Sequence, residues 1–84
     1  MASTRSEEFV NVLLLKLRDT RLSRGVSQEQ LAAISGVDLA AISRAERQLR
    51  IPSLASIRDL AKGLDLDFPK LCREVEKALR DKSV

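Results

Sequence analysis

Signals that start and stop helices recur at short intervals along this chain, and they limit it to an assembly of short helices. Ser27, Asp38, Ser53 and Asp67 are of the residue types whose side chains can accept hydrogen bonds from the first turn of a helix. Glycine follows several of the segments that these residues open, as it does where helices end. The spacing predicts five helices: about Arg5 to Arg24, Gln28 to about Ser35, Asp38 to Glu46, Ser53 to Gly63, and about 68 to 81. The predicted fold class is therefore all-α.

Apolar residues return every three or four positions within each predicted helix, which assigns one face of each helix to the core. Thr4 and Glu7 have the spacing of a capping box at the start of the first helix, and Gly63 is expected to terminate the fourth. The predicted inward residues are Leu13, Leu14, Leu17, Leu31, Ala32, Ile34, Ile42, Ala45, Leu54, Ile57, Leu60 and Ala61, with Val37 in the turn before the third helix. No repeat or long linker divides the chain, so residues 1–84 are predicted to form one domain.

The composition excludes several classes of function. Cys72 is the only cysteine and the chain has no histidine, so neither an intrachain disulfide nor a zinc site of the usual spacing is expected. The lack of histidine also removes the common nucleophile and general-base schemes, and the carboxylates are scattered through the helices. We therefore expect no enzyme activity, no cofactor and no metal.

Charge and hydropathy point to the partner and the location. Arginine is concentrated between residues 18 and 58, whereas acidic residues crowd both ends. The net charge of +3 is small, so a solvated basic face explains this distribution as well as a polyanionic partner does. The apolar run from Phe9 to Leu17 is far shorter than the roughly 18 residues that a membrane span needs. Acidic residues stand where a secretory signal is basic, so a cytoplasmic location is expected.

The second and third predicted helices form the most informative unit. Two short helices joined by a tight glycine turn are typical of a helix-turn-helix, in which the second helix enters the major groove of DNA. Ala32 is small where the two helices approach each other, and Gly36 can adopt a positive φ. Val37 and Ile42 supply apolar contacts beneath the turn. The segment from Gln28 to Glu46 therefore fits this motif at each constrained position.

These residues resemble the lambda-repressor-like, Cro-type (XRE) helix-turn-helix transcriptional regulators. The resemblance covers roughly Leu13 to Leu71. It rests on Gly25-Val26-Ser27-Gln28-Glu29-Gln30-Leu31-Ala32, Gly36-Val37, Ile42-Ser43, Glu46-Arg47, Arg50 and Pro52-Ser53-Leu54. Short members of this family include phage repressors, controller proteins of restriction-modification systems, and antitoxins. The resemblance implies a compact five-helix DNA-binding domain.

The resemblance also implies roles for individual residues. It places Gln28, at the start of the second helix, against a DNA phosphate. It further implies a buried ion pair between Arg21 and Glu46. The family commonly has glycine where this chain has Gln48. Either Gln48 adopts a strained backbone, or the loop takes another path and moves the phosphate contacts of the neighbouring arginines with it.

Steps of 100 degrees along the third helix identify its outward side. The residues expected to contact DNA are Gln28, Asp38, Leu39, Ala40, Ser43, Arg44, Arg47 and Arg50. Arg44 is the best candidate for base readout, because a guanidinium can donate two hydrogen bonds to guanine O6 and N7. A phosphate contact or a surface salt bridge is the alternative for Arg44. Leu39 and Ala40 suit a thymine methyl, whereas in the alternative Leu39 packs internally or is simply exposed.

One such helix reads few base pairs, which favours a two-fold homodimer on half-sites about one DNA turn apart. The last predicted helix carries an apolar stripe that is the candidate dimer interface: Phe68, Leu71, Cys72, Val75 and Leu79. In the alternative, this helix closes the core of the monomer. Val12 or Leu15 of the first predicted helix can extend the dimer contact surface. The sequence thus predicts a homodimeric transcriptional regulator of a palindromic operator. The alternative is an antitoxin or interaction module whose main partner is another protein.

Overall fold

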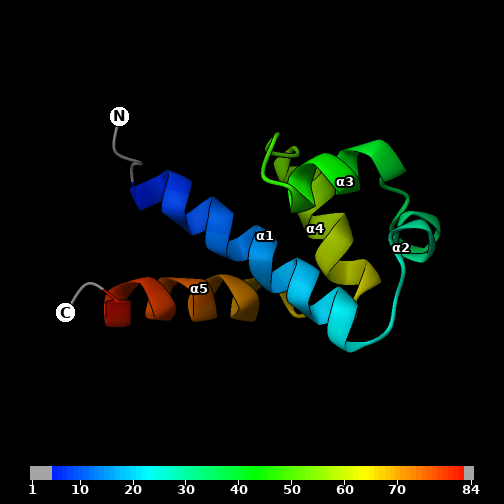
Figure 1. The fold of residues 1–84 in the computed structure, drawn as a ribbon. Helices are drawn as coiled ribbons and strands as arrows, with labels where there is room; N and C mark the ends of the chain where they lie inside the picture. Colours follow the sequence, from blue (N-terminus) through cyan, green and yellow to red (C-terminus); the bar gives the residue numbers. More distant parts are fainter. Residues whose placement is uncertain (1–4, 83–84) are drawn as a thin grey trace.

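A computed structural model describes residues 5–82 of the chain. Its five helices are α1 (Arg5–Ser23), α2 (Gln28–Ser35), α3 (Leu39–Glu46), α4 (Leu54–Gly63) and α5 (Phe68–Lys82), and no strand occurs between residues 5 and 82. In Figure 1, α1 crosses the molecule diagonally, with α5 on one side of it and α2, α3 and α4 on the other. The all-α class and the predicted order of five helices are confirmed. The capping box predicted for the first helix includes Thr4, which lies outside the described residues.

One core joins all five helices. Its members are Leu13, Leu14 and Leu17 of α1, Leu31 of α2, Val37, Ile42 and Ala45 in and before α3, Ile57, Leu60, Ala61 and Leu64 in and after α4, and Leu71 and Val75 of α5. These are aliphatic side chains at helical spacing, so each short helix is held by its apolar stripe rather than by its own backbone bonds. Over residues 5–82 no helix combines the length and apolar character that crossing a membrane requires, and no three His, Cys, Asp or Glu side chains are grouped to hold a metal ion.

Two residues that the periodicity assigned to the core are exposed. Ile34 is 61% exposed and Leu54 is 71% exposed. The atoms of α2 that lie nearest to Gly63 of α4 belong to Leu31 and Ser35, whereas Ile34 is largely exposed. Leu54 is the first residue of α4, one turn before the buried part of that helix begins at Ile57. The prediction was wrong for both residues because a helical period does not show where the neighbouring helix ends.

Gly63 also differs from its predicted role. It is the last residue of α4 rather than a stop signal beyond it, and its φ is not in the left-handed region. A Cβ at this position would lie 3.1 Å from the Cβ of Ser35. The glycine therefore permits α4 to approach α2 closely, and the left-handed residue after the helix is Asp65, with φ 56°.

Capping side chains begin three of the helices. Ser27 and Gln30 form the predicted capping box, with Ser27 Oγ accepting from the Gln30 N–H and Gln30 Oε1 accepting from the Ser27 N–H. Ser53 and Asp67 cap α4 and α5 as predicted. Asp38 occupies the N-cap position of α3, but its side chain makes no capping hydrogen bond, so this part of the prediction was wrong.

Candidate nucleic-acid interface

The turn between α2 and α3 has the geometry of a helix-turn-helix. Gly36 ends α2 in the left-handed region, with φ 76°, and its N–H donates to the carbonyl of Ala32 at 2.9 Å. Ser35 Oγ accepts from the N–H of Val37 at 3.1 Å, which fixes the next residue of the turn. Val37 and Ile42 are then buried beneath it. This sequence of contacts sets the angle at which α3 leaves the turn.

The two sides of α3 are sharply different. Ile42 and Ala45 are buried in the core, at 1% and 2% exposure. Asp38, Leu39, Ala40 and Arg44 are exposed, as the 100-degree steps predicted, whereas Ser43 is half-buried. Figure 1 shows α3 at the edge of the molecule, with α2 at one end of it and the loop to α4 at the other. The outer side of the helix is thus exposed to solvent, while its inner side is held by the protein.

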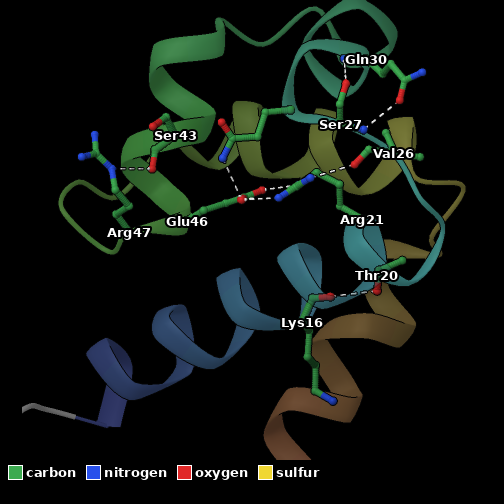
Figure 2. Close-up of polar contacts among 10 residues, drawn as sticks. Lys16, Thr20, Arg21, Val26, Ser27, Gln30, Ser43, Glu46 and Arg47 are labelled. Atoms are coloured by element: carbon green, nitrogen blue, oxygen red, sulfur yellow. Dashed lines mark hydrogen bonds and ion pairs between the residues drawn. The ribbon is translucent and has the colours of Figure 1, made fainter.

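A bidentate ion pair fixes the end of α3 to α1. The Nε of Arg21 lies 2.7 Å from Glu46 Oε2, and the second guanidinium nitrogen donates to Glu46 Oε1 at 2.8 Å. The two side chains are 9% and 10% exposed. The remaining nitrogen of Arg21 donates to the carbonyl of Val26 at 2.8 Å, so the same guanidinium also holds the turn before α2 (Figure 2). The ion pair implied by the family resemblance is present.

Hydrogen bonding keeps both partners charged. Burial raises the pKa of Glu46, but hydrogen bonds from Arg21 and Gln28 together with the positive charges of Arg21 and Arg18 outweigh it, and the pKa lies below its usual value. The hydrogen bond to Glu46 raises the pKa of Arg21 against the opposing effect of burial. The pair is therefore ionised at neutral pH, which is the state in which its geometry is strongest.

Gln28 belongs to this network as well as to the predicted DNA contact. It is the first residue of α2 and is half-buried, and its Nε2 donates to Glu46 Oε1 at 3.0 Å. An amide nitrogen carries two hydrogens, so one of them stays available for a phosphate. The sequence did not indicate this bond, because the two residues are far apart in the chain and no helical or strand spacing relates them. The phosphate contact of Gln28 stays a prediction.

The loop after α3 decides between the two conformations that were considered for Gln48. Its φ is 58°, in the left-handed region, and its N–H donates to the carbonyl of Ala45 at 3.0 Å. The N–H of Leu49 donates to the carbonyl of Arg44 at 2.9 Å, which completes the pattern of a Schellman motif. Of the two alternatives, the strained backbone at Gln48 is therefore correct. Arg47 and Arg50 are exposed on either side of it, and Arg47 Nε lies 3.4 Å from the Ser43 carbonyl (Figure 2).

The stripe on α5 is divided between the core and the surface. Leu71 and Val75 are 5% and 0% exposed within one copy of the chain, so they leave almost no area for a partner. Phe68, Cys72 and Leu79 are half-buried, and burial followed by the charge of Glu76 raises the pKa of the Cys72 thiol. The interpretation in which α5 closes the monomer core accounts for Leu71 and Val75. A dimer contact stays a prediction for the other three.

Comparison with known proteins places this geometry in a family. The chain matches the family model described as helix-turn-helix over residues 17–71, more than half of its length. The chain therefore belongs to the helix-turn-helix family of DNA-binding regulators. The match includes α2, α3, α4 and both partners of the ion pair, and it begins within α1 and ends within α5.

Two proteins of similar sequence show which members of the family this chain resembles. The control protein C.SmaI from Serratia marcescens is 40% identical over 64 residues, which cover 76% of each chain. The uncharacterized HTH-type transcriptional regulator y4dL from Sinorhizobium fredii is 35% identical over 66 residues. That match covers 79% of this chain and 34% of the relative, so the chain spans about a third of that protein.

Solved structures agree with the sequence comparison. The wild-type restriction-modification controller protein C.Esp1396I superposes with a TM-score of 0.71 and 27% identity, over 92% of this chain and 97% of that one. The same controller, solved as a tetramer in complex with its natural 35 base-pair operator, gives a TM-score of 0.69 and 28% identity over 89% and 95%. The five-helix fold of this chain is thus similar to that of a controller protein over about nine-tenths of its length.

Proposed function

We propose that this chain is a sequence-specific DNA-binding transcriptional regulator that acts as a homodimer on a palindromic operator, with α3 in the major groove. The observation that carries the proposal is the contrast between the two sides of α3. The inner side is fixed by Ile42, Ala45 and the Arg21–Glu46 ion pair, and the outer side is exposed. The similar controller protein C.Esp1396I has been solved in complex with its operator, which supports the proposal. Such a regulator works in the cytoplasm, where its operator is.

The outer side of α3 offers chemistry for reading bases. Arg44 is exposed and can donate two hydrogen bonds to a guanine. Leu39 is 39% exposed and lies beside Ala40, so the two can contact a thymine methyl. Asp38 and Ser43 supply acceptors and a hydroxyl donor at the same surface. This set is suited to specificity rather than to affinity alone.

Positive charge around α3 is suited to the DNA backbone. Arg47 and Arg50 are exposed in the loop at one end of the helix, and Gln28 keeps one amide hydrogen at the start of α2. Phosphate contacts of this kind fix the register of a protein on the duplex without reading sequence. A single α3 of eight residues reads few base pairs, so two copies related by a two-fold axis are proposed to share an operator.

The test separates base readout from phosphate binding. A preferred duplex is first selected from a random pool, and fluorescence anisotropy then compares it with a scrambled duplex. Arg44→Ala is expected to remove about 1–3 kcal/mol of discrimination at one base pair and to leave binding to the scrambled duplex nearly unchanged. Arg73→Ala is the matched control, because it removes an exposed arginine from α5.

The salt dependence distinguishes DNA from a protein partner. Affinity for the selected duplex should fall steeply as salt rises, because each neutralised phosphate releases a counterion. Arg47→Ala should reduce that slope by about one. An equal loss on all sequences in Arg44→Ala would make Arg44 a phosphate contact. Failure to bind any duplex would refute the proposal and favour the antitoxin or interaction-module alternative.

A further inference from the structure

The side chain of Asp38 stands before α3 without capping it. Its backbone has the extended N-cap conformation, with φ −60° and ψ 138°, and its carbonyl accepts from the N–H of Ile42 at 3.1 Å. Its carboxylate makes no capping hydrogen bond. Asp67, before α5, does make one, with Oδ1 accepting from the N–H of Lys70 at 3.1 Å. Asp38 thus lacks a bond that its residue type normally makes at this position.

No other group of the described chain holds this carboxylate. Asp38 is exposed, and no hydrogen bond or ion pair within the described residues involves its side chain. Its backbone is fixed on both sides, because Val37 is buried before it and Ile42 is buried after it. Leu39 and Ala40, its exposed neighbours, carry no charge. An unpaired carboxylate is therefore presented by a fixed backbone at the end of α3 nearest to α2 (Figure 1).

This charge is unfavourable on a surface that meets DNA. The phosphates of a duplex repel a carboxylate, whereas they attract the arginines of the same surface. In a helix-turn-helix, the N-terminal residues of the second helix lie against base edges. A carboxylate at that place lowers the affinity for any duplex unless a base donates a hydrogen bond to it. Selectivity explains such a residue better than affinity does.

The donors in the major groove narrow the choice of base. An ionised carboxylate only accepts hydrogen bonds. Guanine presents N7 and O6 there and thymine presents O4, and these acceptors repel a carboxylate. Cytosine N4 and adenine N6 are the exocyclic amino groups that present a hydrogen in this groove. A base that carries such an amino group is therefore the ligand that fits Asp38.

We propose that Asp38 accepts a hydrogen bond from the exocyclic amino group of one operator base, cytosine N4 or adenine N6, and that methylation of this amino group blocks the contact. The inference rests on the proposed DNA binding through α3 and adds a base class and a mode of regulation to it. One hydrogen of the amino group forms the base pair and the other points into the major groove. Methylation that keeps the base pair replaces the second hydrogen. Asp38 then loses its donor and faces a methyl group instead.

The spacing along α3 predicts which base pair is concerned. Asp38 and Arg44 are six residues apart, which is about 9 Å along a helix at 1.5 Å per residue. Base pairs follow one another at about 3.4 Å. For a helix that lies along the groove, the base pair that depends on Asp38 should be about two or three pairs from the one that depends on Arg44.

The first experiment locates the base pair. A duplex selected from a random pool is changed one base pair at a time, and anisotropy measures its binding to the unaltered chain and to Asp38→Ala. At one cytosine or adenine, a change should cost the unaltered chain roughly 10- to 100-fold in affinity and cost Asp38→Ala almost nothing. Asp38→Ala should bind a scrambled duplex roughly 3- to 10-fold more tightly than the unaltered chain does, because a repelled charge is gone.

Asp67→Asn is the matched control. It also removes one negative charge, but at the start of α5, and asparagine still caps the helix. An equal gain on the scrambled duplex in this variant would assign the effect to net charge and contradict the repulsion at Asp38. Thermal unfolding followed by circular dichroism should be the same in Asp38→Ala as in the unaltered chain, because no capping bond is lost.

The second experiment tests methylation at the base pair so located. The duplex is made with N4-methylcytosine or N6-methyladenine there, according to the base found. The unaltered chain should bind it roughly 10- to 100-fold more weakly than the unmethylated duplex, whereas Asp38→Ala should bind both alike. For a cytosine, 5-methylcytosine is the control, because it adds a methyl group to the groove and keeps the N4 donor.

Three results would overturn the inference: a base discrimination that is the same with and without the Asp38 carboxylate, a dependence on guanine or thymine instead, or unchanged binding to the methylated duplex. Each of them comes from a chain that binds its selected duplex, so each leaves the proposed function intact. If the unaltered chain bound no duplex, the proposed function would fail and the role of Asp38 would fail with it.

Discussion

The inner and outer sides of α3 use arginine in opposite ways. On the inner side, Arg21 is held by Glu46 and by the carbonyl of Val26, and it is almost fully buried. On the outer side, Arg44 is exposed, and no acceptor within residues 5–82 binds its guanidinium. A satisfied buried guanidinium stabilises the fold and offers nothing to a ligand, whereas a free one can bind DNA and contributes little to folding. The arginine that stabilises the fold and the arginine that we propose to bind DNA thus lie on opposite sides of one short helix.

The largest expected effect tests the inner side. Arg21→Ala leaves the Glu46 carboxylate buried without its partner, so the free energy of unfolding should fall by about 3–5 kcal/mol. Arg44→Ala should change the same quantity by no more than about 0.5 kcal/mol, because it removes an exposed side chain without a partner. Urea denaturation followed by circular dichroism measures both. Comparable losses in the two variants would contradict the separation.

A double substitution refines this prediction. Replacing both charges, as in Arg21→Met with Glu46→Leu, leaves no unpaired charge and should destabilise the chain much less than Arg21→Ala does. The double variant also removes the acceptor of Gln28, whose Nε2 bonds to Glu46. If the double variant were as unstable as Arg21→Ala, the buried charge would not be the cause of the loss.

A smaller effect on the inner side depends on pH. The folded state lowers the pKa of Glu46 below its unfolded value of about 4.3, since the hydrogen bonds from Arg21 and Gln28 and the nearby positive charges together outweigh the effect of burial. The stabilisation is therefore complete above that value and is lost as pH falls through the lower pKa of the folded state. Unfolding measured from pH 7 to pH 2 should show a decline in this window that is shallower in the double variant. Identical profiles would assign the acid sensitivity to other carboxylates.

The sequence was sufficient to predict which residues form the inner side of α3, because they follow from helical periodicity and capping. Ile42 and Ala45 lie at the spacing of a buried stripe, and Ser27 with Gln30 marks where α2 begins. These signals depend on residues close together in the chain, and a local rule can detect them. The ion pair joins residues far apart in sequence, and only the resemblance to a family indicated it.

The errors about which apolar residues are buried within the chain share one physical cause. Ile34 and Leu54 have the right period for burial, yet no neighbouring helix covers them. Leu71 and Val75 were assigned to a dimer contact, yet the chain's own core covers them. Which apolar residues are covered depends on how the helices are arranged in space, and the sequence of a single helix does not contain that information.

The smallest expected effect lies at the end of α3, where the chain passes from its inner side to its outer loop. Gln48 has a φ of 58°, a conformation that is unfavourable for residues with a Cβ. Gln48→Gly should relieve about 1–2 kcal/mol of this strain, and the greater freedom of glycine in the unfolded chain should offset about half of it. The net stabilisation expected is about 0.5 kcal/mol, measured by urea denaturation. Gln48→Ala is the matched control, because it removes the long side chain and keeps the strained backbone.

If alanine stabilised the chain as much as glycine, the side chain of Gln48 and not its backbone would be unfavourable there. In neither variant should base discrimination by Arg44 change, since the inner side of α3 still fixes the helix.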